Sequence, residues 1–332
     1  MKRKSITVLL QNYRLLILLA FIFLLMYFLA PSFFNKYNLI AILSNASING
    51  IIAVGMTLLM ISRAFDMSVG SNLVLSGAIT VIGVNRFGPF VGVSLGLASG
   101  LLMGFTNGLL VARLKINSFI ATLGTFVIYQ GLTFSITKMT PVATENVGFS
   151  KIAGTALLGI PIVVFYFVIA ILIVWVVLRF TQLGKYAYAI GGNSQACKSI
   201  GIKVERHWII YFVISGFFAS VSGVILSSKI MAASAIFGEN IGLIIVAAIV
   251  LGGVSLAGGV GNVVGVVQAI IIIGVIENIT VYLGMIGYWQ LFFRAIVLIG
   301  VILYDVISLQ QSSNRLARYE LSLIKADRTE LQ

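Results

Sequence analysis

Charged side chains are scarce in this chain of 332 residues, at 9% against the roughly 25% of ordinary soluble domains. Hydrophobic residues make up 60% of the sequence. They form runs of about 20 residues, which as helices are long enough to cross a hydrocarbon core of ~30 Å. The composition therefore excludes a soluble globular protein and predicts an all-α, polytopic membrane protein.

Cysteine and histidine each occur only once, as Cys197 and His207. A single cysteine excludes an internal disulfide, and its polar, basic neighbours predict an ordinary thiol in a cytosolic loop. His207 stands beside Trp208 at the start of an apolar run, where packing at the membrane interface is expected. Because no cluster of His, Cys or carboxylate residues surrounds either residue, the sequence indicates no metal site and no cofactor.

Sequence features of an enzyme are also missing. No Gly-x-x-x-x-Gly-Lys-Ser/Thr phosphate loop occurs, so any ATP must be hydrolysed by another polypeptide. No carboxylate pair, and no nucleophile beside a base, falls in a plausible site outside the membrane. We therefore expect no catalytic residues.

Hydropathy predicts ten spans, near residues 15–33, 39–61, 68–84, 90–111, 118–137, 161–179, 208–229, 241–257, 262–283 and 287–307. If both termini are cytoplasmic, the inner segments hold 16 of the 22 basic residues and the outer segments hold five, namely Lys36, Arg86, Lys138, Lys151 and Lys229. This asymmetry sets the orientation by the positive-inside rule. It explains the formal charge of +13 without nucleic acid and predicts a multi-pass membrane protein with both termini cytoplasmic.

The predicted domains are a cytoplasmic N-terminus at 1–14, a transmembrane domain at 15–307 and a cytoplasmic tail at 308–332. The basic start followed by apolar residues resembles a signal peptide. Because the apolar stretch exceeds a signal core, and Ala30 is followed by Pro31, an uncleaved first span is expected. The longest inner segment, 180–207, separates five spans from five. Two related halves with an odd number of spans must be inverted relative to each other, as in many transporters.

A polar break, Ser62-Arg63-Ala64-Phe65-Asp66-Met67-Ser68, interrupts the chain between the second and third spans. Irregular backbone is tolerated within a membrane only where protein or a water-filled cavity satisfies it. Asp66 or Ser68 is expected to cap the third span by accepting its first amides. The other interpretation is that the break, including Gly70, lies beside a translocation path.

Glycine is abundant, at 34 residues, and forms two patterns. A stripe with a spacing of four predicts close packing of one helix face against another backbone; it consists of Gly92, Gly96, Gly100, Gly104 and Gly108. The run from Gly252 to Asn262, which contains Gly253 and Ser255, is too rich in glycine for a continuous helix. We expect this run to be the second half's counterpart of the break at Asp66.

Two charges, Glu277 and Arg294, fall inside the last two predicted spans. Both lie about 10 Å from the shared outer turn, counted along the helix rise. A charge at such depth pairs or faces water. They are candidates for an intramembrane ion pair, with a pore-lining role or a proton relay as alternatives.

The inner segment 180–207 contains a sequence typical of a short capped helix. Asn193 or Ser194 is the expected N-cap, and Gly201 the left-handed stop after Ile200. Such a helix is either solvated surface or a protrusion that docks into a partner.

Together with this segment, three stretches resemble the permease subunits of bacterial ATP-binding-cassette importers for ribose, xylose, galactose and autoinducer-2. They are Gly55-Met56-Thr57 through Phe65-Asp66-Met67-Ser68-Val69-Gly70-Ser71, then Phe119-Ile120-Ala121-Thr122-Leu123-Gly124-Thr125, and Val250-Leu251-Gly252-Gly253-Val254-Ser255-Leu256-Ala257-Gly258-Gly259. The resemblance covers most of the chain from Asn38 to Asp305.

The resemblance implies a membrane permease that pairs with a second permease subunit, identical or related, within the lipid bilayer. Two cytosolic ATPases would drive it, and an extracytoplasmic binding protein would deliver the sugar or sugar-like solute. It also implies a coupling helix that docks in the ATPase, with the residues Asn193, Ser194, Ala196, Cys197 and Gly201.

Two positions depart from the family pattern. Arg63-Ala64-Phe65-Asp66 replaces the usual Gly-Gly-Ile-Asp and is closer to an autoinducer-2 permease, whereas Cys197 replaces an alanine as an expected mild surface change. A rival hypothesis is an ion-coupled secondary transporter that uses Asp66 or Glu277.

Overall fold

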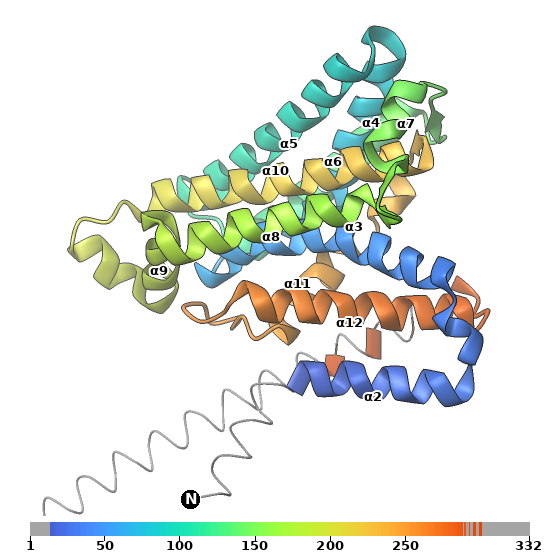
Figure 1. Cartoon of the computed structure of the whole chain (residues 1–332). Coiled ribbons are helices and arrows are strands. Elements are labelled where there is room, and N and C mark those ends of the chain that lie inside the picture. Colours follow the sequence, from blue (N-terminus) through green and yellow to red (C-terminus); the bar gives the residue numbers. More distant parts are fainter. Residues whose placement is uncertain (1–13, 288, 290–291, 293–294, 297–298, 301–332) are drawn as a thin grey trace, which may run out of the picture.

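The computed structural model describes residues 14–287 together with residues 289, 292, 295–296 and 299–300 (Figure 1). The first part of the chain contains α2 (Arg14–Leu29), the 3-10 helix η1 (Pro31–Phe34), α3 (Lys36–Ile61), α4 (Val69–Phe87), α5 (Pro89–Ala112) and α6 (Ser118–Thr137). The second part contains α8 (Ile162–Phe180), α9 (Gln182–Ser199), α10 (Val204–Ile230), the 3-10 helix η2 (Ala235–Gly238), α11 (Ile241–Leu251) and α12 (Val263–Tyr282).

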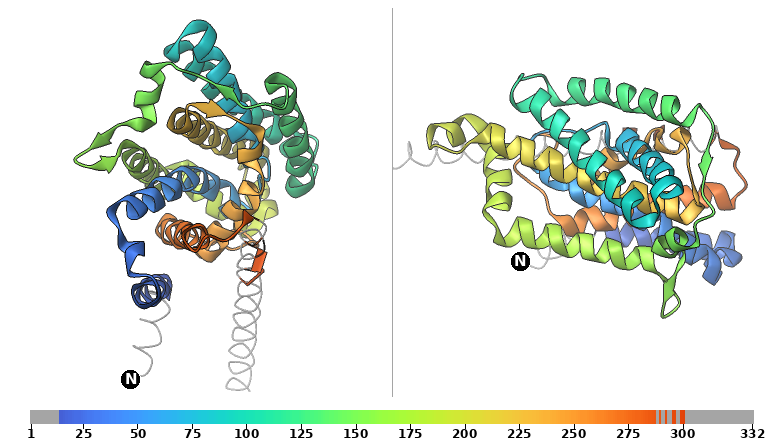
Figure 2. Two further views of the ribbon diagram at one scale, coloured as in Figure 1. Left: turned by 90° about the vertical axis from the view of Figure 1, so that its right-hand side faces the viewer. Right: turned by 90° about the horizontal axis from the view of Figure 1, so that it is seen from above.

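A small cap of mixed structure joins the two parts. It consists of α7 (Val147–Gly154) and of two antiparallel pairs of very short strands, β1 (Val142–Ala143) with β4 (Ala232–Ala233) and β2 (Ala156–Leu157) with β3 (Ile160–Pro161). The sequence analysis did not predict this cap. It lies at the end of the molecule opposite α9, and the long helices run between these two ends (Figures 1 and 2).

The helical class is confirmed. Six of the described helices are long and apolar enough to cross a membrane, namely α3, α5, α6, α8, α10 and α12, and two shorter apolar helical stretches accompany them. The count of ten spans stays a prediction, because most of the tenth span lies outside the described residues. Arg294, residues 1–13 and the tail 308–332 lie outside them as well.

Two predicted boundaries were wrong. Helix α10 begins at Val204, before the expected start near Trp208, so part of the expected inner loop is helical. Helix α11 ends at Leu251 rather than near Ala257. It ends there because Gly253 has a φ of 89°, a left-handed conformation that stops a helix.

The core is centred on α3. Every residue from Gly50 to Ile61 is buried, and α3 packs against α8, α10 and α12. Lipid would also accommodate an apolar helix, so it is this burial by other helices that places α3 at the centre. Helix α3 is therefore the central helix of the bundle, and α8, α10 and α12 pack around it.

The glycine stripe of α5 packs as predicted, but against two helices in succession. Cβ atoms added at Gly92 and Gly96 would collide with α4, and Cβ atoms added at Gly100, Gly104 and Gly108 would collide with α10. At Gly108 the added atom would lie 2.8 Å from the Cα of Ile209. One stripe thus fixes α4 and α10 to the same face of α5.

Changing Gly104 to alanine is expected to destabilise the protein by about 1–3 kcal/mol, because the added methyl meets backbone of α10 that cannot move aside cheaply. Gly124→Ala is the matched control, since a Cβ there meets nothing within 4 Å. Thermal unfolding of the purified protein in detergent measures both. Equal midpoints for the two variants would contradict the packing argument.

Candidate functional site

The chain between α3 and α4 leaves helical structure at Ser62 and returns to it at Val69. This broken connection is buried, with Asp66 only 1% exposed and Ser68 fully buried. The predicted break is therefore real, and it lies inside protein. Its polar groups must find protein partners, because burial without a partner costs several kcal/mol.

The Asp66 carboxylate is the centre of these interactions. Its Oδ1 accepts hydrogen bonds from the amide and the hydroxyl of Ser68, at 3.0 and 2.6 Å. Its Oδ2 accepts one from the hydroxyl of Ser215 on α10, at 3.1 Å. Asn107 on α5 donates to the Ser68 hydroxyl at 2.7 Å and more weakly to Asp66 at 3.4 Å. The cluster joins the break to two other helices.

Helix α6 accepts two further amides of the break. The amide of Phe65 donates to the hydroxyl of Ser118 at 3.1 Å, and the amide of Met67 donates to the hydroxyl of Thr122 at 3.0 Å. Both acceptors lie in the first turns of α6. The break is thus held by side chains from three helices.

The capping prediction was right for Asp66 only in part. Asp66 accepts the Ser68 amide, which precedes the first residue of α4, and Ser68 makes no side-chain cap hydrogen bond. The hydroxyl of Ser68 is already used as a donor to Asp66 and as an acceptor from Asn107. Ser68 therefore forms hydrogen bonds within the Asp66 cluster and does not cap α4.

A second broken connection leads into α11. After α10 the chain runs through β4 and η2 to Asn240, and the first turn of α11 lies against the break at Asp66. A Cβ on Gly242 would lie 2.6 Å from the carbonyl oxygen of Met67, and Gly70 and Gly238 are in equally close backbone contact. The N-termini of α4 and α11 therefore meet inside the protein. Half-helices that end at such a point are typical of transporter binding sites.

This meeting point corrects the expected correspondence between the two halves. If spans one to five match spans six to ten, the connection from α3 to α4 corresponds to the connection from α10 to α11, not to the glycine run after α11. The 26 and 27 residues of α3 and α10 agree with that pairing.

The glycine run does break the helix, as predicted. Gly253, Gly258, Gly259 and Gly261 all have positive φ angles. However, the predicted residues of this run, Gly252, Gly253 and Ser255, do not belong to the Asp66 cluster. Gly252 packs on α12. The hydroxyl of Ser255 accepts the amide of Ala257 at 3.2 Å.

The glycine run lies instead between the end of α3 and the middle of α9. The amide of Gly259 donates to the carbonyl of Ile61 at 2.8 Å, and a Cβ on Gly191 of α9 would collide with both of these backbones. The hydroxyl of Tyr188 on α9 donates to the carbonyl of Gly261 at 2.8 Å. Helix α9 is thus in direct contact with the last residue of α3 and with the glycine run.

The capped helix expected after Asn193 is confirmed. Asn193 has extended dihedral angles (φ −154°, ψ 96°) that divide α9 into two pieces, and its Oδ1 accepts the amide of Ala196 at 2.9 Å. At the other end Gly201 has a φ of 88°. The amides of Gly201 and Ile202 donate to the carbonyls of Lys198 and Cys197, which is a Schellman motif. This second piece of α9 runs from Ser194 to Ser199.

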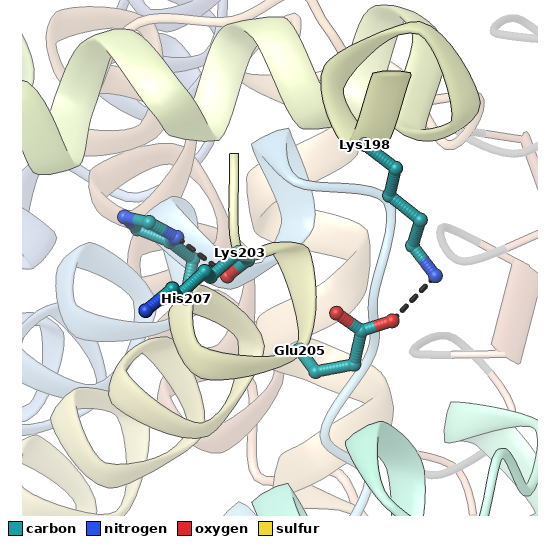
Figure 3. Close-up of polar contacts among 4 residues, drawn as sticks. All are labelled: Lys198, Lys203, Glu205 and His207. Atoms are coloured by element: carbon teal, nitrogen blue, oxygen red, sulfur yellow. Dashed lines mark hydrogen bonds and ion pairs between the residues drawn. The ribbon is translucent and has the colours of Figure 1, made fainter. Parts of the chain in front are cut away.

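One ion pair joins the piece from Ser194 to Ser199 to α10. The ammonium of Lys198 lies against the carboxylate of Glu205 on the first turn of α10, while His207 Nδ1 contacts the carbonyl of Lys203 at 2.9 Å (Figure 3). Trp208 on the next turn donates to the carbonyl of Ser62 at 3.2 Å. The start of α10 thereby contacts both the second piece of α9 and the break after α3.

The expected surface position of Cys197 was wrong. Its side chain is 5% exposed and belongs to the main hydrophobic core, whereas Asn193, Ala196 and Gly201 are exposed and Ser194 is half-buried. The exposed apolar residue of this protrusion is Ile200, at 77% exposure. Ile200 was not among the predicted contact residues.

Sequence reasoning also missed Asn107, Ser215, Ser118 and Thr122. Asn107 could have been found, because it lies on the same face of α5 as the glycine stripe and is therefore directed into the protein. The other three are hydroxyl residues in apolar helices, which commonly bond to their own backbone. No sequence signal distinguishes them.

Discontinuous helices whose ends meet inside the protein are typical of membrane transporters. Residues 38–302 match the family described as "Branched-chain amino acid transport system / permease component", and the chain belongs to this family. No solved structure matches the chain.

Curated relatives agree with this assignment. The ribose import permease protein RbsC of Bacillus subtilis (strain 168) is 37% identical over 83% of this chain and 87% of its own length. The L-arabinose transport system permease protein AraH of Escherichia coli (strain K12) is 33% identical over 89% and 90%. The galactose/methyl galactoside import permease protein MglC of Haemophilus influenzae (strain ATCC 51907 / DSM 11121 / KW20 / Rd) is 35% identical over 92% and 96%.

Changing Asp66 to alanine is expected to lower stability by about 1–3 kcal/mol or more, because the donors of Ser68 and Ser215 lose their buried acceptor. Asp66→Asn keeps one acceptor oxygen for Ser68 and is expected to unfold near the wild-type temperature. If Asp66→Asn assembles but does not transport, the carboxylate charge also serves the transport path. Equal destabilisation by both substitutions would contradict the hydrogen-bonding role.

Gly191→Ala is expected to reduce transport coupled to ATP hydrolysis at least fivefold, because the methyl forces α9 away from Ile61 and Gly259. Gly192→Ala is the matched control, since its added Cβ meets nothing within 4 Å. Transport and ATP hydrolysis are measured in the same proteoliposomes. A normal ratio of transport to hydrolysis in Gly191→Ala would exclude this contact from coupling.

Proposed function

We propose that this chain is the membrane-spanning subunit of an ATP-driven sugar importer, and that the helix from Ser194 to Ser199 receives the force of a cytosolic ATPase. The carrying observation is the direct contact of α9 with the last residue of α3 and with the glycine run. The proposed coupling helix continues through Asn193 into the piece of α9 that carries Gly191, so its displacement reaches both contacts.

The transport cycle follows from this connection. ATP binding closes the ATPase pair and displaces the coupling helix, and α9 shifts the ends of α3 and α11 with it. The junction where the N-termini of α4 and α11 meet then opens to one side of the membrane or to the other, as a shift in population between two packings. Asp66, Ser68 and Gly70 lie at this junction, whereas Gly252, Gly253 and Ser255 belong to the transmitting contact.

The proposed assembly contains a second permease subunit, identical or related, within the membrane. An extracytoplasmic binding protein delivers the solute. The end that carries α9 faces the cytoplasm, together with both termini, as the distribution of basic residues indicates. Loop 180–207 is the coupling segment of the transmembrane domain 15–307.

The cargo is proposed to be a pentose, a hexose or a similar sugar-like molecule such as autoinducer-2. Relatives named for ribose, arabinose and galactose support a sugar, and the segment Arg63-Ala64-Phe65-Asp66 is the basis for autoinducer-2. Specificity is assigned to the binding protein, because the described part of the chain brings no cluster of Asp, Asn and Trp around an open cavity.

An ion-coupled secondary transporter is the alternative, with Asp66 or Glu277 as the ion site. Oδ1 of Asp66 accepts the amide and the hydroxyl of Ser68, and Oδ2 accepts the hydroxyl of Ser215, so both oxygens already have structural donors. Uphill transport by the reconstituted chain alone, driven by a proton or sodium gradient, would establish the alternative.

Ala196→Arg is expected to reduce ATP hydrolysis stimulated by the binding protein at least tenfold, because it places a bulky charge on the exposed face of the coupling helix. Ile200→Asp is expected to do the same by removing the exposed apolar contact. Gln182→Arg, an exposed position at the start of α9, is the control. Copurification of the ATPase measures docking, and undiminished copurification and hydrolysis in both variants would overturn the proposed docking site.

A further inference from the structure

A short hairpin of residues 155–161 joins α7 to α8 at the end of the molecule opposite α9 (Figure 1). Its two strands, β2 and β3, pair in antiparallel fashion, and the amide of Ile162, the first residue of α8, donates to the carbonyl of Thr155 at 3.0 Å. Figure 2 shows the hairpin at the side of α8, pointing away from the other helices. We call it the side hairpin.

The tip of the side hairpin is apolar and exposed. Leu158 is 92% exposed, and Leu157 and Ile160 are 51% and 43% exposed. No charged residue occurs in the sequence between Lys151 and Arg179. Contiguous apolar surface of this kind marks a site of interaction with a membrane or another protein.

The backbone of the turn also indicates an apolar environment. Leu158 and Gly159 form the two-residue turn, with φ angles of 55° and 78°. A turn with two positive φ angles favours Asn, Asp or Gly at its first position, and a bulky side chain there is strained. Strain of this kind is a reason to look for a function. The function that fits a leucine at an exposed tip is contact with apolar material.

The length of α8 places the side hairpin relative to the membrane. Helix α8 has 19 residues, which at ~1.5 Å each span about 28 Å, close to the ~30 Å of a hydrocarbon core. Its first residue, Ile162, therefore lies near one edge of the hydrocarbon, and the hairpin directly before it lies at the level of the lipid headgroups. Because the hairpin points sideways from the bundle, it lies over lipid.

The surface of α8 beside the hairpin is suited to lipid. Five of its 19 residues are buried, and they form one narrow stripe: Val163, Phe167, Ala170, Val174 and Leu178. An apolar hollow of about 300 Å³ lies between α8 and α10, and its lining includes Ile152 of α7 with Ile169 and Ile173 of α8. Acyl chains are as apolar as these side chains and adapt to such a hollow.

We propose that the side hairpin is a membrane anchor. The side chains of Leu157, Leu158 and Ile160 insert between the lipid headgroups and the first carbons of the acyl chains, in the leaflet at the end of the molecule opposite α9. The lipid removes their apolar surface from water, and this contact offsets the strain at Leu158. A hairpin of two short strands, which is marginal in water, is stabilised by the same contact.

The anchor would act on α10 through α7. The amide of Ala153 on α7 donates to the hydroxyl of Ser228 on α10 at 3.1 Å, and that hydroxyl donates to the carbonyl of Phe149 at 2.7 Å. Because α7 is fastened to α10 in this way, the side hairpin would hold the end of α10 far from α9 at a constant depth in the membrane. The opposite end of α10 is then the one that moves with the coupling helix.

The test uses the full chain with Cys197→Ala, assembled with its ATPase in nanodiscs of phosphatidylcholine and phosphatidylglycerol. A fluorophore is attached to one introduced cysteine, at Leu158→Cys, Leu172→Cys or Glu145→Cys. Leu172 is exposed in the middle of α8 and is the control for the hydrocarbon core. Glu145 is an exposed charged residue between β1 and α7 and is the control for water.

Nitroxide groups attached to the lipid and iodide in the water are the two quenchers. Compared with the label at Glu145, the label at Leu158 is expected to be quenched about twofold more by a nitroxide near the headgroup and about threefold less by iodide. The label at Leu172 should be quenched best by a nitroxide near the end of the acyl chain.

Leu157→Asp/Ile160→Asp in the Leu158→Cys protein should release the tip into water, because carboxylates are costly in lipid. Quenching of the label by iodide should then rise to the value at Glu145. Val147→Asp is the matched control, since Val147 is an exposed apolar residue of α7 outside the side hairpin, and it should leave the quenching unchanged. Size-exclusion profiles and copurification of the ATPase establish that each variant is folded.

Three results would overturn the anchor. Equal quenching by iodide at Leu158 and Glu145 would place the hairpin in water. Protection of Leu158 from iodide only after the binding protein is added would assign the hairpin to that protein. A disulfide between the Leu158→Cys positions of two copies, without quenching by lipid, would assign it to a subunit interface. None of these results changes the proposed transport function, because transport and ATP hydrolysis are measured separately.

Discussion

The structure depends on one constraint: backbone that is not helical can lie inside a membrane protein only if other parts of the protein supply its hydrogen bonds. The segment from Ser62 to Ser68 meets this constraint with side chains from three helices. Ser118 and Thr122 accept its amides, and Asp66 gathers the hydroxyls of Ser68 and Ser215. Because Ser118 and Thr122 lie on α6 and Ser215 lies on α10, the position of the break determines how those helices pack.

The fold also requires backbones to approach one another closely, and glycine makes this possible. Gly70 against Gly238, Gly242 against Met67 and Gly191 against Gly259 are all contacts in which a methyl group would meet backbone atoms. They bring together four segments of the sequence, near Gly70, Gly238, Gly191 and Gly259. The junction of α4 with α11 and the contact of α9 with the glycine run therefore rest on positions without side chains, and a substitution there would displace the backbone.

Much of the architecture could be predicted from the sequence, because the signals were local. Apolar runs predicted the helices, the spacing of glycines in α5 predicted its packed face, and Asn193 with Gly201 predicted a capped helix with its left-handed stop. The partners of Asp66 could not be predicted, since Ser215 is 149 residues away and hydroxyl residues in apolar helices usually bond to their own turn. The burial of Cys197 was missed for a related reason: a short solvated helix and one that packs a single side chain into the core have the same caps. The glycine run was paired with Asp66 because both interrupt helices, whereas the order of the helices pairs the break at Asp66 with the connection from α10 to α11.

The way the α5 stripe is divided has a consequence for motion. Its first two glycines are pressed on α4 and its last three on α10, so a sliding or rotation of α5 against either helix would drive backbone into backbone. Helices α4, α5 and α10 must therefore move together as one rigid unit. The looser boundaries, such as the one between α8 and α10, are where the molecule can bend.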